Sequence, residues 1–157
     1  MDYANCTLCP RTCGVNRTAG ERGFCGCPDT ALVAKTMLHQ WEEPALAGSG
    51  GSGAVFFGGC TLGCRYCQNA AISGGPVGPP TDSAGLRRIF EELIAQGAEN
   101  IDLVTPTQYL PTLLPALTPK LSVPVEPLPF TPLKTEKFTP RTMAPLGSLT
   151  DISRPSA

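Results

Sequence analysis

The sequence predicts an α/β fold built on a parallel sheet, and three observations support this prediction. Residues 54–57 are a short apolar run with β-favouring side chains, bounded by glycines. A helical period follows over residues 82–97, and residues 100–105 then resemble a second strand. Residues 110–117 continue as a second helix, and residues 121–125 look like the start of a third strand. The order β-α-β-α-β implies parallel strands joined by right-handed crossovers.

The first predicted helix has a defined start, face and end. Asp82 or Ser83 can cap its first turn, and Gly97 stops it. Between them, five apolar side chains recur at helical spacing on one face: Leu86, Ile89, Phe90, Leu93 and Ile94. This pattern predicts an amphipathic helix.

The remaining segments give weaker signals. Pro111 opens the second helix, and Pro115 weakens it because proline has no amide donor. Residues 31–38 are expected to form a short strand. Residues 48–53, Gly-Ser-Gly-Gly-Ser-Gly, have the composition of a flexible linker.

Length and composition exclude several classes of protein. The chain has 157 residues, enough for one domain with or without a tail. Glycine and proline number 17 each, about 22% together against an average of roughly 12%, so turns and loops are abundant. The net charge is −1 and charged residues are 16%, which provides no basic surface for nucleic acid or anionic membranes.

The eight cysteines point to metal binding. No run approaches the roughly 20 apolar residues of a membrane-spanning helix, and the first residues lack the basic and apolar regions of a signal peptide. A cytoplasmic location is therefore expected, where disulfides are rare. Eight cysteines in a reducing compartment favour a metalloprotein.

Three cysteines follow the first predicted strand with gaps of three and then two residues: Cys60, Cys64 and Cys67. Three thiolates on one tight loop can hold three irons of a cubane cluster and leave the fourth iron open to a substrate. Glycines at positions 58, 59 and 63 let the backbone pass close to such a cluster. The loop also leaves the carboxyl end of a strand, where sites gather in parallel α/β folds.

The alternative for these three cysteines is a zinc knuckle. Structural zinc usually takes four ligands from paired Cys-x2-Cys elements. No fourth cysteine or histidine lies near the trio, and the single histidine, His39, is 21 residues before Cys60. The spacing therefore favours the cluster.

At this point the sequence resembles the radical S-adenosylmethionine enzymes, whose hallmark is this cysteine spacing with an aromatic, here Tyr66, before the last cysteine. Four further strings are similar to the pyruvate formate-lyase activating enzyme-like branch of that superfamily. They are CTLCPRTCGVNR at 6–17, HQWEEP at 39–44, GSGAVFFGGC at 51–60 and CQN at 67–69. The resemblance covers residues 6 to about 125, and it implies that residues 48–53 lead into the first strand of a (β/α) partial barrel.

The resemblance implies a cofactor set and a reaction. Cys60, Cys64 and Cys67 would ligate a 4Fe–4S cluster, whose fourth iron would be chelated by S-adenosylmethionine, with Tyr66 near the adenine. Reductive cleavage of S-adenosylmethionine would give a 5′-deoxyadenosyl radical that abstracts hydrogen, in activating enzymes from a glycine of a protein partner. A flavodoxin- or ferredoxin-type electron donor is the other implied partner.

The end of the second predicted strand departs from the family pattern. Many members of the superfamily have a Gly-Gly-Glu motif there that contacts the amino group of S-adenosylmethionine. This chain has Thr-Pro-Thr-Gln over residues 105–108, with neither an acid nor paired glycines. No residue of this segment is assigned to the cofactor.

Residues 1–30 are expected to form an irregular cysteine-rich region ordered by metal. Four thiolates can serve one metal, with Cys27 as a spare: Cys6, Cys9, Cys13 and Cys25. Zinc and a second iron–sulfur cluster both suit four cysteines, and binding of no metal is the third alternative. The segment His39–Pro44 is interpreted as an exposed turn, with a substrate-facing acid as the alternative.

The predicted organisation has three parts. Residues 1–47 are the cysteine-rich region, residues 48–125 an incomplete partial barrel of the radical S-adenosylmethionine type, and residues 126–157 a Pro-rich, disordered tail. The barrel of the superfamily that the sequence resembles usually has six β-α units. Since one unit takes about 30 residues, a complete barrel would need roughly 180 residues. Residues 54–125 offer two units and the start of a third, which predicts a truncated or frame-shifted copy.

Three hypotheses of function follow from the sequence. The first is a radical S-adenosylmethionine enzyme of the glycyl-radical-enzyme-activating type. The second is a non-catalytic truncated fragment that binds an iron–sulfur cluster. The third is a zinc-ordered interaction module.

Overall fold

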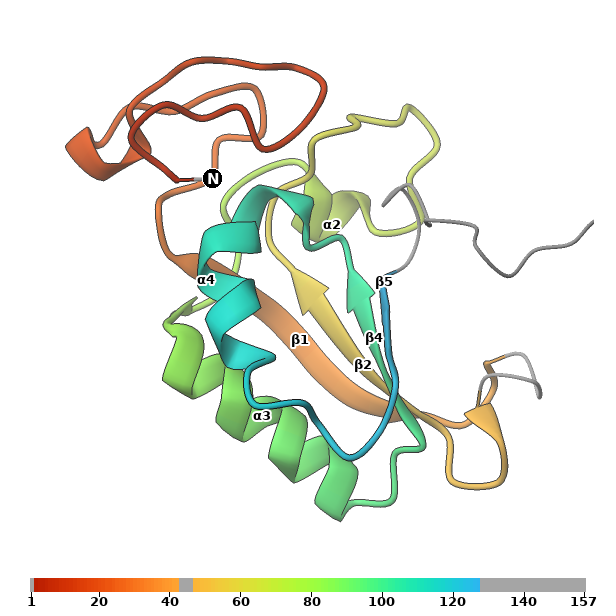
Figure 1. The fold of residues 1–157 in the computed structure, drawn as a ribbon. Helices are drawn as coiled ribbons and strands as arrows, with labels where there is room; N and C mark the ends of the chain where they lie inside the picture. Colours follow the sequence, from red (N-terminus) through yellow and green to blue (C-terminus); the bar gives the residue numbers. More distant parts are fainter. Residues whose placement is uncertain (1, 43–46, 128–157) are drawn as a thin grey trace, which may run out of the picture.

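The computed structural model describes residues 2–42 and 47–127, in which five strands form one open sheet of order β3-β1-β2-β4-β5 (Figure 1). The strands are β1 (Ala31–His39), β2 (Ser52–Phe57), β3 (Pro80–Thr81), β4 (Asn100–Val104) and β5 (Val125–Pro127). The helices are α2 (Ala70–Ser73), α3 (Ser83–Ala95) and α4 (Leu110–Ala116), with 3-10 turns η1 (Arg17–Ala19) and η2 (Thr107–Tyr109).

Strands β2, β4 and β5 are parallel, which confirms the predicted β-α-β-α-β order. Val55 lies opposite Leu103 in the β2–β4 pair, and Ile101 lies opposite Val125 in the β4–β5 pair. Because the connections are crossovers, the carboxyl ends of all three strands lie at the same edge of the sheet. Figure 1 shows the N-terminal loops and the segment leading to α2 at that edge.

The prediction for the third strand was wrong in its bounds. Residues 121–124 are loop, and the strand begins at Val125, where the predicted strand ends. Pro124 has no N–H for a ladder, although its carbonyl accepts a hydrogen bond from Ile101. The expected boundary between residues 125 and 126 therefore falls inside β5, and residues 128–157 of the predicted tail lie outside the described residues.

The prediction of an all-parallel sheet was also wrong, because β1 joins the sheet antiparallel to β2. His39 pairs with Ser52 and Met37 with Ala54. The predicted strand at 31–38 does form, and it pairs with the strand that follows it in the chain, as is common for antiparallel strands. Strand β3 also pairs antiparallel with β1, so the sheet of the described chain is mixed.

The glycine-rich stretch 48–53 is packed structure, so the linker interpretation from composition was wrong. Ser52 and Gly53 belong to β2, and the Glu99 carboxylate accepts hydrogen bonds from the amides of Ser49 (2.9 Å) and Gly50 (2.7 Å). These hydrogen bonds lower the pKa of Glu99. The expectation that this stretch leads into the first parallel strand is confirmed.

Helix α3 matches its prediction closely. The Asp82 side chain caps the helix by accepting a hydrogen bond from the Gly85 amide at 2.7 Å. Gly97, at φ 102°, follows its end. Three of the predicted apolar residues are buried and two are partly buried against the same core: Leu86, Phe90 and Leu93, then Ile89 and Ile94.

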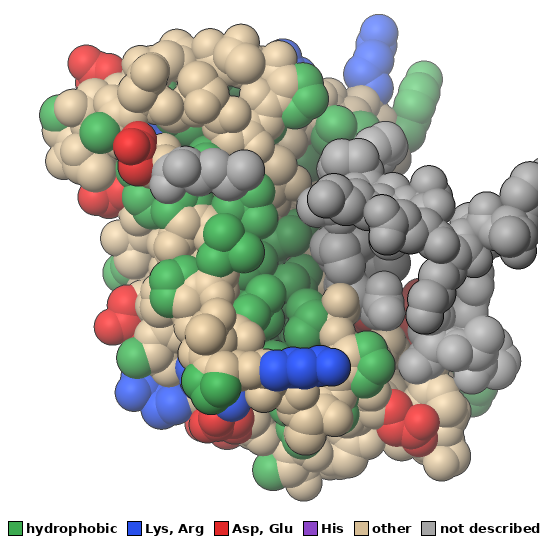
Figure 2. Space-filling model, in the orientation of Figure 1, with side chains coloured by type: hydrophobic (Ala, Val, Ile, Leu, Met, Phe, Trp, Pro, Cys, Tyr) green, Lys and Arg blue, Asp and Glu red, His purple; other side chains and the backbone are tan. Residues whose placement is uncertain are grey.

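Helix α4 packs beside α3 and completes the helical layer. It accommodates Pro115 in its interior and buries Leu113 and Ala116. No helix in the described part of the chain is long and apolar enough to cross a membrane. Figure 2 shows hydrophobic side chains gathered in a band below the N-terminal loops, toward the middle of this face.

Gly58 and Gly59 form a corner at the end of β2 where four segments meet. Their amides donate to Leu32 and Ile72, both at 2.9 Å, and their carbonyls accept hydrogen bonds from Tyr109 Oη and Gln108 Nε2, both at 2.9 Å. Gly59 adopts φ 71°, and a Cβ there would overlap the Cys27 sulfur. A Cβ on Gly58 would overlap the carbonyl of Val77.

We predict that Gly59→Ala destabilises the protein by about 2 kcal/mol or more, because alanine meets both the left-handed backbone and the Cys27 sulfur. The midpoint of urea unfolding measures the effect. Gly75→Ala is the matched control, since no atom lies within 4 Å of its added Cβ. A change below about 0.5 kcal/mol for Gly59→Ala would contradict the close packing of this corner.

Candidate metal centre

The loop with Cys60, Cys64 and Cys67 leaves the carboxyl end of β2 and runs into α2, as the sequence predicts. Cys60 and Cys67 are partly buried, whereas Cys64 is exposed. Cys60 and Cys67 line a small pocket between the ends of the parallel strands β2 and β4. Its full lining is Phe57, Gly59, Cys60, Cys67, Asn69, Ile72, Ser73, Val104 and Thr105.

Two hydroxyl groups donate hydrogen bonds to these sulfurs. Thr105 Oγ1 lies 3.6 Å from Cys60 Sγ, and Ser73 Oγ lies 3.4 Å from Cys67 Sγ. The Leu62 amide donates to Cys60 Sγ at 3.5 Å. Donors of this kind stabilise thiolate charge and tune the reduction potential of a cluster. Thr105 and Ser73 could not be found from the cysteine spacing, because they reach the sulfurs from the residue after β4 and from α2.

The donor set fits an iron–sulfur cluster. The three cysteines of the loop are free thiols, and sulfur is the ligand that iron–sulfur clusters take. No three His, Cys, Asp or Glu side chains in the described residues are grouped so that they could hold one metal ion. Thiolates spread along one loop suit a multi-iron cluster better than a single zinc.

Tyr66 lies in the same loop with 97% of its surface exposed. Nothing in the described structure packs it into the pocket between β2 and β4. Its predicted position near the adenine of S-adenosylmethionine stays a prediction.

Gln108 ties the end of the second strand to the cysteine loop. It is 1% exposed, and its Nε2 donates to the carbonyls of Gly59 and Thr105, both at 2.9 Å. The sequence analysis assigned no role to this residue because it departs from the family pattern. Its amide holds the ends of β2 and β4 together beside the cysteines.

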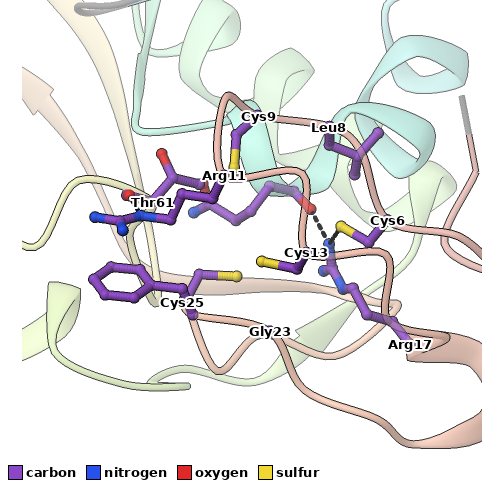
Figure 3. Close-up of a pocket in the computed structure, with 11 residues that line it drawn as sticks. Cys6, Leu8, Cys9, Arg11, Cys13, Arg17, Gly23, Cys25 and Thr61 are labelled. Carbon is purple, nitrogen blue, oxygen red and sulfur yellow. Dashed lines mark hydrogen bonds between the residues drawn. The ribbon is translucent and has the colours of Figure 1, made fainter.

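The four other predicted ligands, which follow one another over residues 6–25, line a second pocket (Figure 3). They are Cys6, Cys9, Cys13 and Cys25. Cys27, the predicted spare, is fully buried outside that pocket, and its thiol donates to the carbonyls of Cys25 and Gly58. The structure therefore places four of these five cysteines around one pocket and Cys27 apart from them.

The thiols of Cys25 and Cys27 influence each other. Hydrogen bonding to Cys27 lowers the pKa of Cys25 to about 6. Hydrogen bonding to Cys25 and burial raise the pKa of Cys27. Burial also raises the pKa of Tyr109, which packs beside Cys27 in the main core. Cys25 is thus the more readily ionised thiol of the pair.

Two arginines join the N-terminal region to the rest of the fold. Arg11 donates to the carbonyls of Thr61 (2.6 Å) and Leu62 (3.1 Å), within the cysteine loop, and its guanidinium lies 3.3 Å from the centre of the Phe24 ring. Arg17 is 1% exposed and donates to the carbonyl of Gln108 at 2.7 Å and to that of Pro28.

The segment after β1 lies at the other end of the sheet. His39 pairs with Ser52, the first residue of β2, whereas the cysteine loop follows its last residue. His39 Nε2 lies 3.7 Å from a carboxylate oxygen of Glu42, and Trp41 is 89% exposed. These positions favour the exposed turn over a substrate-facing acid; Glu43 and Pro44 lie outside the described residues.

Comparison with known proteins relates the cysteine loop to a class of domain. Residues 46–105 match the family described as a 4Fe-4S single cluster domain, a span that includes Cys60, Cys64 and Cys67. The match supports an iron–sulfur cluster binding domain of that type over these residues, with a 4Fe–4S cluster as its cofactor.

A relative of this chain is an uncharacterized protein of the archaeon Methanocaldococcus jannaschii. It is 39% identical over 71 residues, which are 45% of this chain and 20% of the relative. The alignment thus spans about a fifth of the relative's length. No solved structure matches the chain.

We predict that Arg17→Met destabilises the protein by about 2 kcal/mol or more, because the buried carbonyls of Gln108 and Pro28 lose their donor. Urea unfolding measures the effect. Arg22→Met is the control, since Arg22 is exposed. Equal stabilities of the two variants would show that Arg17 does not anchor the N-terminal region.

Proposed function

We propose that this chain is the cofactor-binding part of a radical S-adenosylmethionine enzyme of the glycyl-radical-enzyme-activating type. The observation that supports the proposal is the three-then-two cysteine loop at the carboxyl end of β2, inside the matched 4Fe–4S domain. A cluster held by three cysteines has one iron without a protein ligand. That iron is where S-adenosylmethionine would be chelated.

The chemistry comes from the cofactors. A reduced 4Fe–4S cluster held by Cys60, Cys64 and Cys67 would supply the one electron needed for reductive cleavage of S-adenosylmethionine to methionine and the 5′-deoxyadenosyl radical, which would abstract hydrogen. The protein's part is to hold, orient and shield the reacting groups.

Several residues of this chain are suited to holding and shielding the cofactors. Cys60, Cys64 and Cys67 would hold the cluster, while Thr105 and Ser73 donate to two of the sulfurs. Phe57 and Val104 give the pocket apolar walls that limit access of water. Gly59 lines the same pocket, and its lack of a side chain leaves room for the Cys27 sulfur.

The proposal implies two partners. Each cleavage consumes one electron, so a low-potential donor of the flavodoxin or ferredoxin type is needed. The hydrogen would come from a glycine of a protein substrate, as in the activating enzymes that the sequence resembles. The exposed cysteine loop at the strand ends is the surface such partners would approach.

The second candidate is a non-catalytic protein that binds a cluster without cleaving S-adenosylmethionine. The observation in its favour lies just after β4, where residues 105–108 are Thr-Pro-Thr-Gln and lack the Gly-Gly-Glu motif with which many members of the superfamily contact S-adenosylmethionine.

The deciding experiment is anaerobic reconstitution with iron and sulfide, reduction, and electron paramagnetic resonance with and without S-adenosylmethionine. We expect a 4Fe–4S signal that changes when S-adenosylmethionine is added, together with formation of 5′-deoxyadenosine. A cluster signal that does not respond would support the non-catalytic candidate and reject the enzyme.

The matched control is the variant Cys60→Ser/Cys64→Ser/Cys67→Ser, which removes the proposed ligands and should abolish the response to S-adenosylmethionine. Cys27→Ser, which keeps a donor at a buried position outside both pockets, should retain it. A response that survives in the triple variant would overturn the assignment of the trio.

We also predict that Thr105→Val lowers the reduction potential of this cluster. Valine matches threonine in shape but has no hydroxyl to donate to the Cys60 sulfur, so the more negative reduced state is stabilised less. Potentiometric titration followed by electron paramagnetic resonance measures the shift. An unchanged or raised potential would show that the Thr105 hydroxyl does not act on the cluster.

A further inference from the structure

Four cysteines outside the matched domain converge on one pocket at the N-terminal region. Residues 46–105 account for Cys60, Cys64 and Cys67, and no comparison assigns the cysteines of residues 6–25. The pocket is lined by Cys6, Cys9, Cys13 and Cys25 together with Leu8, Arg11, Arg17, Gly23, Phe24, Thr61 and Gln108.

The arrangement of the sulfurs is visible in Figure 3. The sulfurs of Cys13 and Cys25 face the same space from two separate segments, and that of Cys9 points toward it from above. Cys6 lies beside Arg17, with 3.8 Å between its sulfur and Nη1. Four thiols from loops that share no regular pairing thus line one pocket.

The alternative is four structural thiols in a small core, and the surroundings argue against it. In the described part of residues 1–30, the regular structure is the three-residue turn η1. The apolar cluster there consists of Tyr3, Cys6 and Leu8, with Val15 against it. So small a core offsets little of the entropy of ordering about 30 residues, and other sources must add to it, as the contacts of Arg11 and Arg17 with the rest of the fold do. Metal coordination is such a source.

We propose that Cys6, Cys9, Cys13 and Cys25 bind a second iron–sulfur cluster. A single zinc ion needs sulfurs that converge to about 2.3 Å from one point. In the described part of the chain, no three potential ligands are placed to hold one ion. This holds both for this pocket and for the trio, which lies in the part of the chain that matches a 4Fe–4S domain. A cluster tolerates the wider spacing because its own irons lie between the cysteine sulfurs.

The charges around the pocket suit a cluster. A cluster with four thiolates is anionic, and Arg11 and Arg17 both line the pocket, whereas no carboxylate does. Arg17 is buried beside Cys6, so its charge acts in a region of low dielectric. Cationic side chains stabilise thiolate charge at such positions.

The second cluster would lie next to the first. Thr61, the residue after Cys60, lines the N-terminal pocket, and Arg11 donates to the carbonyls of Thr61 and Leu62 inside the trio loop. One short stretch of backbone therefore separates the two sites. Two reduced clusters so close are expected to show magnetic interaction.

The test uses the full chain with the trio removed by Cys60→Ser/Cys64→Ser/Cys67→Ser. After anaerobic reconstitution, we expect about four irons and four sulfides per chain to remain. Adding Cys9→Ser/Cys13→Ser should remove them, and adding Cys27→Ser should not. Zinc in place of iron, or iron content that does not depend on Cys9 and Cys13, would overturn the proposal.

A second measurement guards against variants that do not fold. In the otherwise unchanged chain, Cys9→Ser/Cys13→Ser should reduce bound iron by about half and abolish magnetic splitting in the fully reduced protein, while the trio's signal persists. Unchanged iron content in a variant with native far-UV circular dichroism would reject the second cluster. Because the trio's signal is read separately, this result is independent of whether S-adenosylmethionine is cleaved.

Discussion

The hydrogen-bonded corner at Gly58 and Gly59 is the constraint on which the rest of the structure depends. Its amides and carbonyls form hydrogen bonds with β1, α2 and the η2 turn, and Cys27 of the N-terminal region packs where a side chain of Gly59 would be. The corner directs the chain out of β2 and into the cysteine loop. The position of Cys60 relative to Thr105 follows from it, because β2 and β4 end side by side.

The two cysteine sets share this support. The trio lies on the loop that the corner starts, and the N-terminal pocket is held against the same loop by Arg11 and against η2 by Arg17. Both pockets are lined by cysteines and by no carboxylate, and cysteine sulfur is the ligand that iron–sulfur clusters take. The lack of carboxylates agrees with the low proportion of charged residues in the chain, 16%. The trio loop and the adjoining N-terminal pocket thus hold seven of the eight cysteines, and the eighth, Cys27, packs into the main core.

Local signals predicted the local structure well. The cap at Asp82, the apolar face of α3 and the stop at Gly97 all lie within one segment, as do the gaps in the trio. What depended on distant partners was missed: the antiparallel addition of β1, the role of Glu99 in ordering residues 48–53, and the start of β5 after Pro124. For the same reason, the sequence predicted the cysteines of both sites but not Thr105, Ser73, Arg11 or Arg17 around them.

The central claim is that the trio holds a cluster with one iron free of protein ligands. Mössbauer spectroscopy of protein reconstituted with ⁵⁷Fe, in the Cys9→Ser/Cys13→Ser variant so that the trio is observed alone, tests it most directly. The account predicts that S-adenosylmethionine shifts the parameters of one iron in four and leaves the other three unchanged. Four irons that all stay unchanged, or a site that takes up zinc instead of iron, would contradict it.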